Sequence, residues 1–264
     1  MKKEEIISYL DTAWVARNLV VHEETVSTNL DAKQLAEEGA ESGTLVVSEM
    51  QTAGRGRRGR TWISPAGEAV YMSLLLRPSC KPEQASALTL VMALAVLEAV
   101  EELKPESCGI KWPNDIVMNG KKICGILTEM SVEKNEISHV VVGVGINANQ
   151  SSFDQEISET ATSLFLELGK RVDRSWLISR VMHHFEEAYE EYEKTWDLTG
   201  LVDRYNRHLL NKDRQVRVLD PKEEYEGTAL GINAQGELLV RKQDGELIEV
   251  YAGEVSVRGI YGYV

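Results

Sequence analysis

The stretch that decides the fold is "ISHVVVGVGINAN", residues 137–149. Valine and isoleucine dominate its first part, and glycines and asparagines close it. A continuous β-branched run is typical of a strand that is covered on both faces. Three other apolar runs have the same character, "GTLVVSEM", "AVYMSLLLRP" and "KKICGILTEM", at residues 43–50, 69–78 and 121–130. Together they predict a central, mostly buried sheet.

Helical patterns alternate with these strands. Residues 85–100, "ASALTLVMALAVLEAV", are too polar and too short for a membrane span and predict a buried core helix. Residues 174–196 carry apolar side chains at helical spacing. In "TVSTNLDAKQLAEEGA", residues 25–40, Thr28 or Asn29 is expected to cap a helix, and a plain cap is also the alternative to a ligand-binding role for Ser27. The predicted fold class is therefore α/β of the α+β type, a central mixed sheet flanked by helices.

The sequence pattern changes after about residue 212. Short alternating stretches such as "QVRVLD" and "GELLVRKQ" are separated by the turns "NAQG" and "QDG". This pattern predicts a small β-barrel rather than a helical domain. We therefore expect two domains, residues 1–212 and 213–264.

Composition limits the classes of partner and compartment. The chain has 42 acidic and 29 basic residues, for a formal net charge of -13, which argues against DNA or RNA as a bulk partner. The odd set of Cys80, Cys108 and Cys124 indicates neither a disulfide framework nor a zinc site. The first residues contain no apolar signal core. We expect a soluble cytoplasmic protein without a membrane segment.

An arginine-rich stretch, "QTAGRGRRGR" at residues 51–60, stands out in this acidic chain. It is compatible with a solvated loop, an RNA-binding patch or a clamp for a small anion. The glycines between the arginines let the backbone approach a ligand closely, and guanidinium groups bind carboxylate or phosphate in a bidentate manner. These features favour the anion clamp. The stretch lacks the Walker pattern, so an ordinary P-loop is disfavoured.

A second polar site is expected at "KWPND", residues 111–115. Pro113 fixes a bend, and Asp115 after it suits Mg²⁺, which prefers hard oxygen ligands; a turn-capping role is the alternative. Lys121 and Lys122 are either solvated turn residues, or one of them turns into a cleft.

Five motifs occur together and in order: "STN" (27–29), the arginine loop, "KWPND", the lysine of "KKICGIL" (121–127) and "GVGIN" (143–147). This set closely resembles the biotin protein ligases from about residue 20 onward. The resemblance implies a catalytic domain like that of class II aminoacyl-tRNA synthetases and a C-terminal SH3-like barrel. It implies that biotin and ATP form biotinyl-5′-AMP with Mg²⁺. Biotin then passes to a lysine of a biotin carboxyl carrier protein.

The same resemblance assigns roles to single residues. The catalytic set it implies is Arg55, Arg57, Lys111, Asp115 and Lys122, with Asp115 as the Mg²⁺ ligand. The biotin-binding set is Ser27, Thr28, Asn29, Gln51, Gly54, Arg55 and Lys122. The ATP-binding set is Arg55, Gly56, Arg57, Lys111, Asn114 and Asn147. The arginine loop and residues 151–160 are the two expected lids.

The chain also departs from the family in ways that shape the expectations. Many relatives carry an N-terminal DNA-binding domain, and the few residues before Ser27 are too short for it, so no DNA binding is expected. The tryptophan that some relatives carry after "GIN" is missing from residues 148–169, so the side chain that stacks on adenine is unassigned.

His183 and His184 are adjacent on a helix and are not expected to face one metal. A homodimer is possible. A lipoate or related acyl-protein ligase, a non-catalytic biotin or nucleotide module and an RNA-binding protein remain alternatives.

Overall fold

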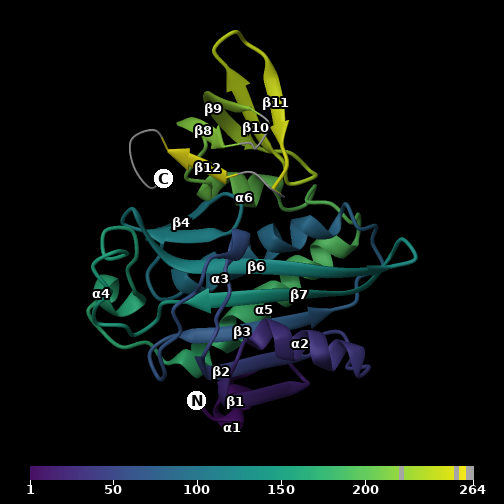
Figure 1. Ribbon diagram of the computed structural model, residues 1–264, viewed down its shortest axis with the longest axis vertical. Helices are drawn as coiled ribbons and strands as arrows, with labels where there is room; N and C mark the ends of the chain where they lie inside the picture. Colours follow the sequence, from purple (N-terminus) through teal and green to yellow (C-terminus); the bar gives the residue numbers. More distant parts are fainter. Residues whose placement is uncertain (220–222, 253–255, 260–264) are drawn as a thin grey trace.

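The computed structural model describes residues 1–219, 223–252 and 256–259. Within them a large sheet with helices on both faces lies beside a smaller, separate sheet (Figure 1). The large sheet has seven strands. In spatial order they are β1 (Leu19–Thr25), β2 (Leu45–Gln51), β3 (Val70–Leu76), β7 (Glu136–Ile146), β6 (Lys121–Glu133), β5 (Asp115–Met118) and β4 (Cys108–Lys111). Because β1 and β2 are parallel and the other pairs antiparallel, the predicted mixed sheet is confirmed.

The valine-rich strand β7 occupies the middle of the sheet, between β3 and β6. Val142 lies opposite Leu74 of β3 and Thr128 of β6. Val140 and Val142 face the main core, whereas Val141 between them packs on the opposite face. Both faces are therefore apolar, as the unbroken run of valines predicts.

Helices cover the two faces of the large sheet. On one face lie α3 (Leu88–Glu101), continued backwards by a short 3₁₀ turn (Ala85–Ala87), and α5 (Arg174–Glu193). α2 (Thr28–Glu37) covers the other face with Ala32 and Ala36. Shorter helices complete the chain: α1 (Lys3–Tyr9), α4 (Leu164–Leu168) and α6 (Val202–His208). None of the helices described is both long and apolar enough to span a membrane.

The start of α2 differs from the expectation. Ser27, not Thr28 or Asn29, is the residue before the helix, and its side chain makes no capping hydrogen bond. The capping role expected of Thr28 or Asn29 is wrong because both lie in the first turn, where their side chains meet the sheet; the N-cap position belongs to Ser27, the other candidate. The Ser73 hydroxyl of β3 is 2.7 Å from Thr28 Oγ1 and 2.6 Å from Asn29 Oδ1.

The smaller sheet is antiparallel and follows α6. The sequence pattern did not predict that helix. Its five strands run in the order β11 (Leu247–Val250), β10 (Leu238–Lys242), β9 (Glu224–Ile232), β8 (Gln215–Leu219) and β12 (Ser256–Gly259). The predicted second domain also includes residues 220–222, 253–255 and 260–264, which lie outside the described residues. Trp112 links the two sheets, because its indole N–H donates to the Gly236 carbonyl at 3.0 Å.

Candidate active site

A small cavity lies where α2 begins. Ser27, Thr28 and Asn29 line it together with Gln51, the last residue of β2. The side-chain oxygen Oε1 of Gln51 accepts from the Thr28 backbone N–H at 3.0 Å and from the Thr28 hydroxyl at 3.2 Å. With Ser73 these side chains form one hydrogen-bonded group. Their polar atoms are thus held in fixed positions beside the cavity.

Glycines of the central strands form the apolar wall of this cavity. A Cβ on Gly143 would lie 2.0 Å from Asn29 Oδ1, so only glycine leaves room for that amide. A Cβ on Gly125 or on Gly145 would lie 2.9 or 2.6 Å from the Trp62 ring. The remaining free volume is about 50 Å³. Trp62 thus fills most of the slot that the strands "CGIL" and "GVGIN" provide.

Trp62 is held in this slot by packing rather than by its polar group. Its indole N–H is buried and has no hydrogen-bond acceptor among the described residues. Lys122 Nζ lies 5.2 Å from the ring centroid, in cation–π range. Trp62 is therefore a plug whose removal would break no indole hydrogen bond.

The arginine loop is a tight hairpin over the cavity. Arg55 and Thr61 form a bridge, and Gly56 N–H donates to the Arg60 carbonyl at 2.7 Å. Gly54 lies underneath, where a Cβ would meet the Trp62 carbonyl at 2.4 Å. The loop therefore needs Gly54 for close packing.

Arg57 joins the loop to two other parts of the chain. Its guanidinium donates to Asn114 Oδ1 at 3.0 Å and to the backbone carbonyl of Ala252. Burial lowers the pKa of Arg57, while attraction from Asp115 acts in the opposite direction. This arginine is the least solvated charge of the loop and is aimed between the two sheets.

The "KWPND" stretch is the turn between β4 and β5. Lys111 and Asp115 face each other across it as paired residues. Lys122, at the start of β6, places its Nζ 2.6 Å from Asp115 Oδ1. Of the two lysines considered from the sequence, Lys122 turns inward, whereas Lys121 donates to the Ser158 carbonyl at 2.9 Å.

A second and much larger cavity, of about 830 Å³, adjoins the first. Residues of the arginine loop, "KWPND" and the segment after β7 line it. Phe153 of that segment contributes an aromatic ring to the wall, a role that the sequence analysis left unassigned. The two cavities share five wall residues: Gly56, Arg57, Trp62, Asn114 and Lys122.

Asn147 lies deep in the wall of the large cavity. Its amide donates to the Thr162 carbonyl at 3.0 Å, and its Oδ1 accepts from Gln150 at 3.2 Å. Lys122 also fixes this region, because its backbone N–H donates to the Thr160 carbonyl at 2.8 Å. The segment that includes residues 151–160 is thereby attached to β6.

The structure brings the predicted site residues together around these two cavities, with Gly54 as the exception. Those at the small cavity are Ser27, Thr28, Asn29, Gln51, Arg55, Gly56, Arg57, Asn114 and Lys122. The large cavity is lined by Gly56, Arg57, Lys111, Asn114, Asp115, Lys122 and Asn147. From the sequence, Trp62 is either a pocket-lining or a core side chain, and neither its place as a plug nor that of Phe153 in the wall is predicted. An aromatic side chain within an otherwise polar loop was the signal for both.

Comparison with known proteins agrees with this geometry. Residues 21–147 match the biotin/lipoate A/B protein ligase family, and residues 213–258 match the biotin protein ligase C-terminal domain. The bifunctional ligase/repressor BirA of Bacillus subtilis is 37% identical over 97% of this chain and 79% of its own. The biotin–[acetyl-CoA-carboxylase] ligase of Mycobacterium tuberculosis is 36% identical over 90% of this chain and 88% of its own. The chain belongs to the biotin/lipoate A/B protein ligase family.

Within that family the likeness is to the biotin ligases. The biotin protein ligase of Aquifex aeolicus in complex with biotin and ATP superimposes with a TM-score of 0.80 at 32% identity, over 92% of this chain and 99% of that one. The resemblance to biotin protein ligases found in the sequence is therefore confirmed.

Proposed function

We propose that this protein is an ATP-dependent biotin protein ligase. It activates biotin with ATP to biotinyl-5′-AMP and transfers biotin to a lysine of a biotin carboxyl carrier protein. One observation carries the proposal: a small apolar slot and a large basic-walled cavity adjoin and share Arg57 and Lys122. The family relatives named as biotin ligases support it.

The small cavity is the proposed biotin site. Ser27, Thr28, Asn29 and Gln51 supply fixed polar atoms for the ureido end, and the strand glycines supply a flat apolar wall. A volume of about 50 Å³ holds a few water molecules at most. Biotin's fused rings therefore enter when Trp62 leaves the slot. Because Trp62 lies two residues after the arginine loop (residues 51–60), its displacement moves that loop, which we assign as the lid.

The chemistry requires two anions to meet. At about 4 Å the biotin carboxylate and the α-phosphate repel each other by roughly 4 kcal/mol at an effective dielectric constant of 20. Arg55, Arg57 and Lys122 offset this repulsion and stabilise the charge that develops on the phosphate. The carboxylate oxygen attacks the α-phosphorus and pyrophosphate leaves. An acceptor lysine amine then attacks the acyl carbon and AMP leaves.

The large cavity is the proposed ATP site. Lys111, Gly56 and Arg57 face the phosphates, and Asn114 and Asn147 lie beside the nucleotide. Phe153 is the aromatic residue we assign to adenine stacking. Asp115, held by Lys122, is the carboxylate we assign to the incoming amine.

Mg²⁺ fits this site as an ion carried mainly by ATP. Such ions are bound by one or two carboxylates plus substrate phosphates, and Asp115 supplies one carboxylate beside the cavity. Bound there, Mg²⁺ would neutralise phosphate charge. Lys122, 2.6 Å from Asp115, and Arg57, bound to Asn114, would orient the reacting oxygens.

Further proposals concern organisation and setting. We assign catalysis to residues 1–212 and place the second domain at residues 213–264, with Asn211 bound to Trp112 N–H at 2.8 Å near the boundary. The acidic balance supports a protein that binds no DNA. Its unpaired cysteines support a reducing cytoplasm. The edge strand β1 is the surface for a possible homodimer, because the segment after α6 already bridges the outer edge of β4; sedimentation would test this.

Exchange of labelled pyrophosphate into ATP tests the proposal. We expect exchange that depends on biotin, none with lipoate as control acid, and its collapse in Arg55→Ala. Equal exchange with lipoate would refute the biotin substrate. A lack of exchange with any acid, combined with steeply salt-dependent RNA binding, would favour the arginine loop as a nucleic-acid patch instead.

A further inference from the structure

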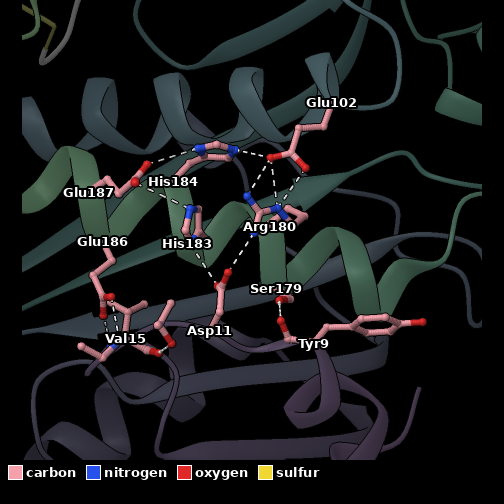
Figure 2. Close-up of polar contacts among 12 residues, drawn as sticks. Tyr9, Asp11, Val15, Glu102, Ser179, Arg180, His183, His184, Glu186 and Glu187 are labelled. Atoms are coloured by element: carbon pink, nitrogen blue, oxygen red, sulfur yellow. Dashed lines mark hydrogen bonds and ion pairs between the residues drawn. The ribbon is translucent and has the colours of Figure 1, made fainter.

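A second group of functional side chains lies on α5, away from both cavities. His183 and His184 are neighbours there, with side chains 28% and 16% exposed. Their rings are 5.3 Å apart and nearly perpendicular, with an interplanar angle of 80°. Figure 2 shows both rings beside the carboxylate of Glu187, one turn further along the helix.

The expectation that these adjacent histidines cannot face one point is wrong. Residues three and four apart on a helix lie on the same side, and Glu187 is four residues from His183 and three from His184. His183 Nε2 lies 3.6 Å from Glu187 Oε1, and His184 Nδ1 lies 3.7 Å from Glu187 Oε2 and also 3.7 Å from Glu98 Oε2 of α3. Glu187 therefore bridges two rings that begin on different sides of the helix.

The other nitrogen of each ring contacts a different carboxylate. His183 Nδ1 is 2.9 Å from Asp11 Oδ1, and His184 Nε2 is 2.6 Å from Glu102 Oε1 (Figure 2). A carboxylate on one ring nitrogen holds the proton there and leaves the opposite nitrogen as a lone-pair donor. Metal-binding histidines show this arrangement almost without exception.

These outer carboxylates are themselves fixed. Arg180 binds Glu102 in a bidentate manner, at 2.9 to 3.0 Å, and reaches Asp11 at 3.2 Å (Figure 2). Asp11 precedes β1 and Glu102 follows α3, so two other parts of the chain converge on α5. The ring orientations are thus set by neighbouring elements as well as by the helix.

The dimensions suit a zinc ion. With Zn–N and Zn–O bonds of about 2.0–2.1 Å, ligand atoms in a tetrahedral site lie about 3.3 Å apart. The separations of 3.6 and 3.7 Å reach the two different oxygens of Glu187, and each exceeds this value by a few tenths of an ångström. With one ligand atom taken from each residue, the three atoms lie within 4.8 Å of one another, so the carboxylate must draw closer for one ion to bind all three. Glu187, 62% exposed, can move the required distance without disturbing packing.

We propose that His183 Nε2, His184 Nδ1 and the Glu187 carboxylate form a zinc-binding site, with solvent in the fourth position. Two imidazoles and one carboxylate are a zinc ligand set, and they differ from the hard oxygen ligands that Mg²⁺ prefers. The site holds α5 and, through Asp11 and Glu102, joins it to the segment before β1 and to the end of α3. It stabilises the helical face and takes no part in ligation.

The alternative is a cluster of ion pairs in which protonated histidines face the carboxylates and no metal binds. The two arrangements differ in whether the imidazole rings bind a metal ion in their neutral form. Zinc binds the deprotonated ring and releases protons on binding, whereas an ion-pair cluster binds no zinc. A zinc site and an ion-pair cluster therefore predict opposite results when zinc is titrated into the protein.

The test is calorimetric titration of zinc chloride into the full chain after treatment with a chelator, without biotin or ATP. Cobalt(II) is added in a parallel experiment, because a tetrahedral site gives it intense visible absorption. We expect one zinc per chain. His183→Gln, His184→Gln and Glu187→Gln should each weaken binding at least about 100-fold, and Asp11→Asn about 10–100-fold.

The matched control is His208→Gln. His208 also lies at a helix surface with one nitrogen 3.5 Å from a carboxylate, that of Glu101, but has no second histidine beside it. It should bind zinc as the unsubstituted chain does. The exposed Glu187→Gln guards against misfolding as an explanation, and circular dichroism checks each variant. Absence of zinc binding by the unsubstituted chain, or zinc binding by the Glu187→Gln and His183→Gln variants as tight as that of the unsubstituted chain, would overturn the proposal.

Discussion

The two adjoining cavities are built in opposite ways. The small one is enclosed by strand residues and by the first turn of α2, whose side chains are hydrogen-bonded to one another. The large one is lined mainly by the arginine loop, the "KWPND" turn and the segment after β7. The cavity enclosed by the sheet has a free volume of about 50 Å³, whereas the cavity lined by loops has about 830 Å³. A rigid sheet can select a molecule by shape, whereas loops can close over reacting groups.

The largest effect on activity is expected from a substitution in the wall that the two cavities share. Lys122→Met keeps most of the side-chain volume but removes the charge that faces Asp115 and both cavities. We expect kcat for pyrophosphate exchange to fall about 10²–10³-fold, because a preorganised cation is lost from the transition state. Stopped-flow or radiolabel exchange measures this. Lys121→Met is the control, and comparable losses in both variants would remove Lys122 from its assigned role.

In the small cavity, a change of shape rather than of charge should weaken biotin binding. Gly143→Ala places a methyl group 2.0 Å from Asn29 Oδ1. Overpacking of this kind typically costs about 1–3 kcal/mol, and displacing Asn29 from the wall should weaken biotin binding about 10–100-fold. Calorimetry with biotin measures the change.

A double-mutant cycle sharpens this prediction. Gly143→Ala combined with Asn29→Ala removes both the clash and the amide, so the combined effect should be smaller than the sum of the single effects. Strict additivity would mean that the alanine acts somewhere other than on Asn29.

The two cavities also differ in how far the sequence predicted them. The valine run of β7, the helix at 85–100 and the ordered motifs were enough for the mixed sheet and for a group of polar residues at its edge. The sequence did not predict that the Trp62 ring packs on Gly125 and Gly145 and fills the slot, because this arrangement depends on three segments meeting in space. The start of α2 was misjudged for the same reason, since Ser73 competes for the side chains expected to cap it. Tertiary contacts overrode local preference there.

The large cavity should respond to the loss of an aromatic ring. Phe153→Ala removes the ring that the segment after β7 contributes to the wall. Stacking of a base on an aromatic side chain is worth about 1–3 kcal/mol, so we expect KM for ATP to rise about tenfold. Biotin affinity should not change. Phe153→Leu keeps the bulk without the ring, and full ATP affinity in that variant would assign the effect to packing.

The smallest expected effect concerns Glu129, which accepts a hydrogen bond at 2.8 Å from Asn29 of the small-cavity wall. Burial raises the pKa of Glu129, but hydrogen bonds from Lys33 and Asn29 outweigh it and hold the pKa below its usual range. A carboxylate with a lowered folded-state pKa stabilises the protein above the ordinary glutamate pKa, about 4.3, and loses that contribution as pH falls through the folded value. Urea midpoints of the unsubstituted chain and of Glu129→Gln should therefore differ at about pH 6 and converge towards about pH 3. A difference that stays constant over this range would mean that Glu129 acts by shape, and that charge plays no part in holding the rigid wall.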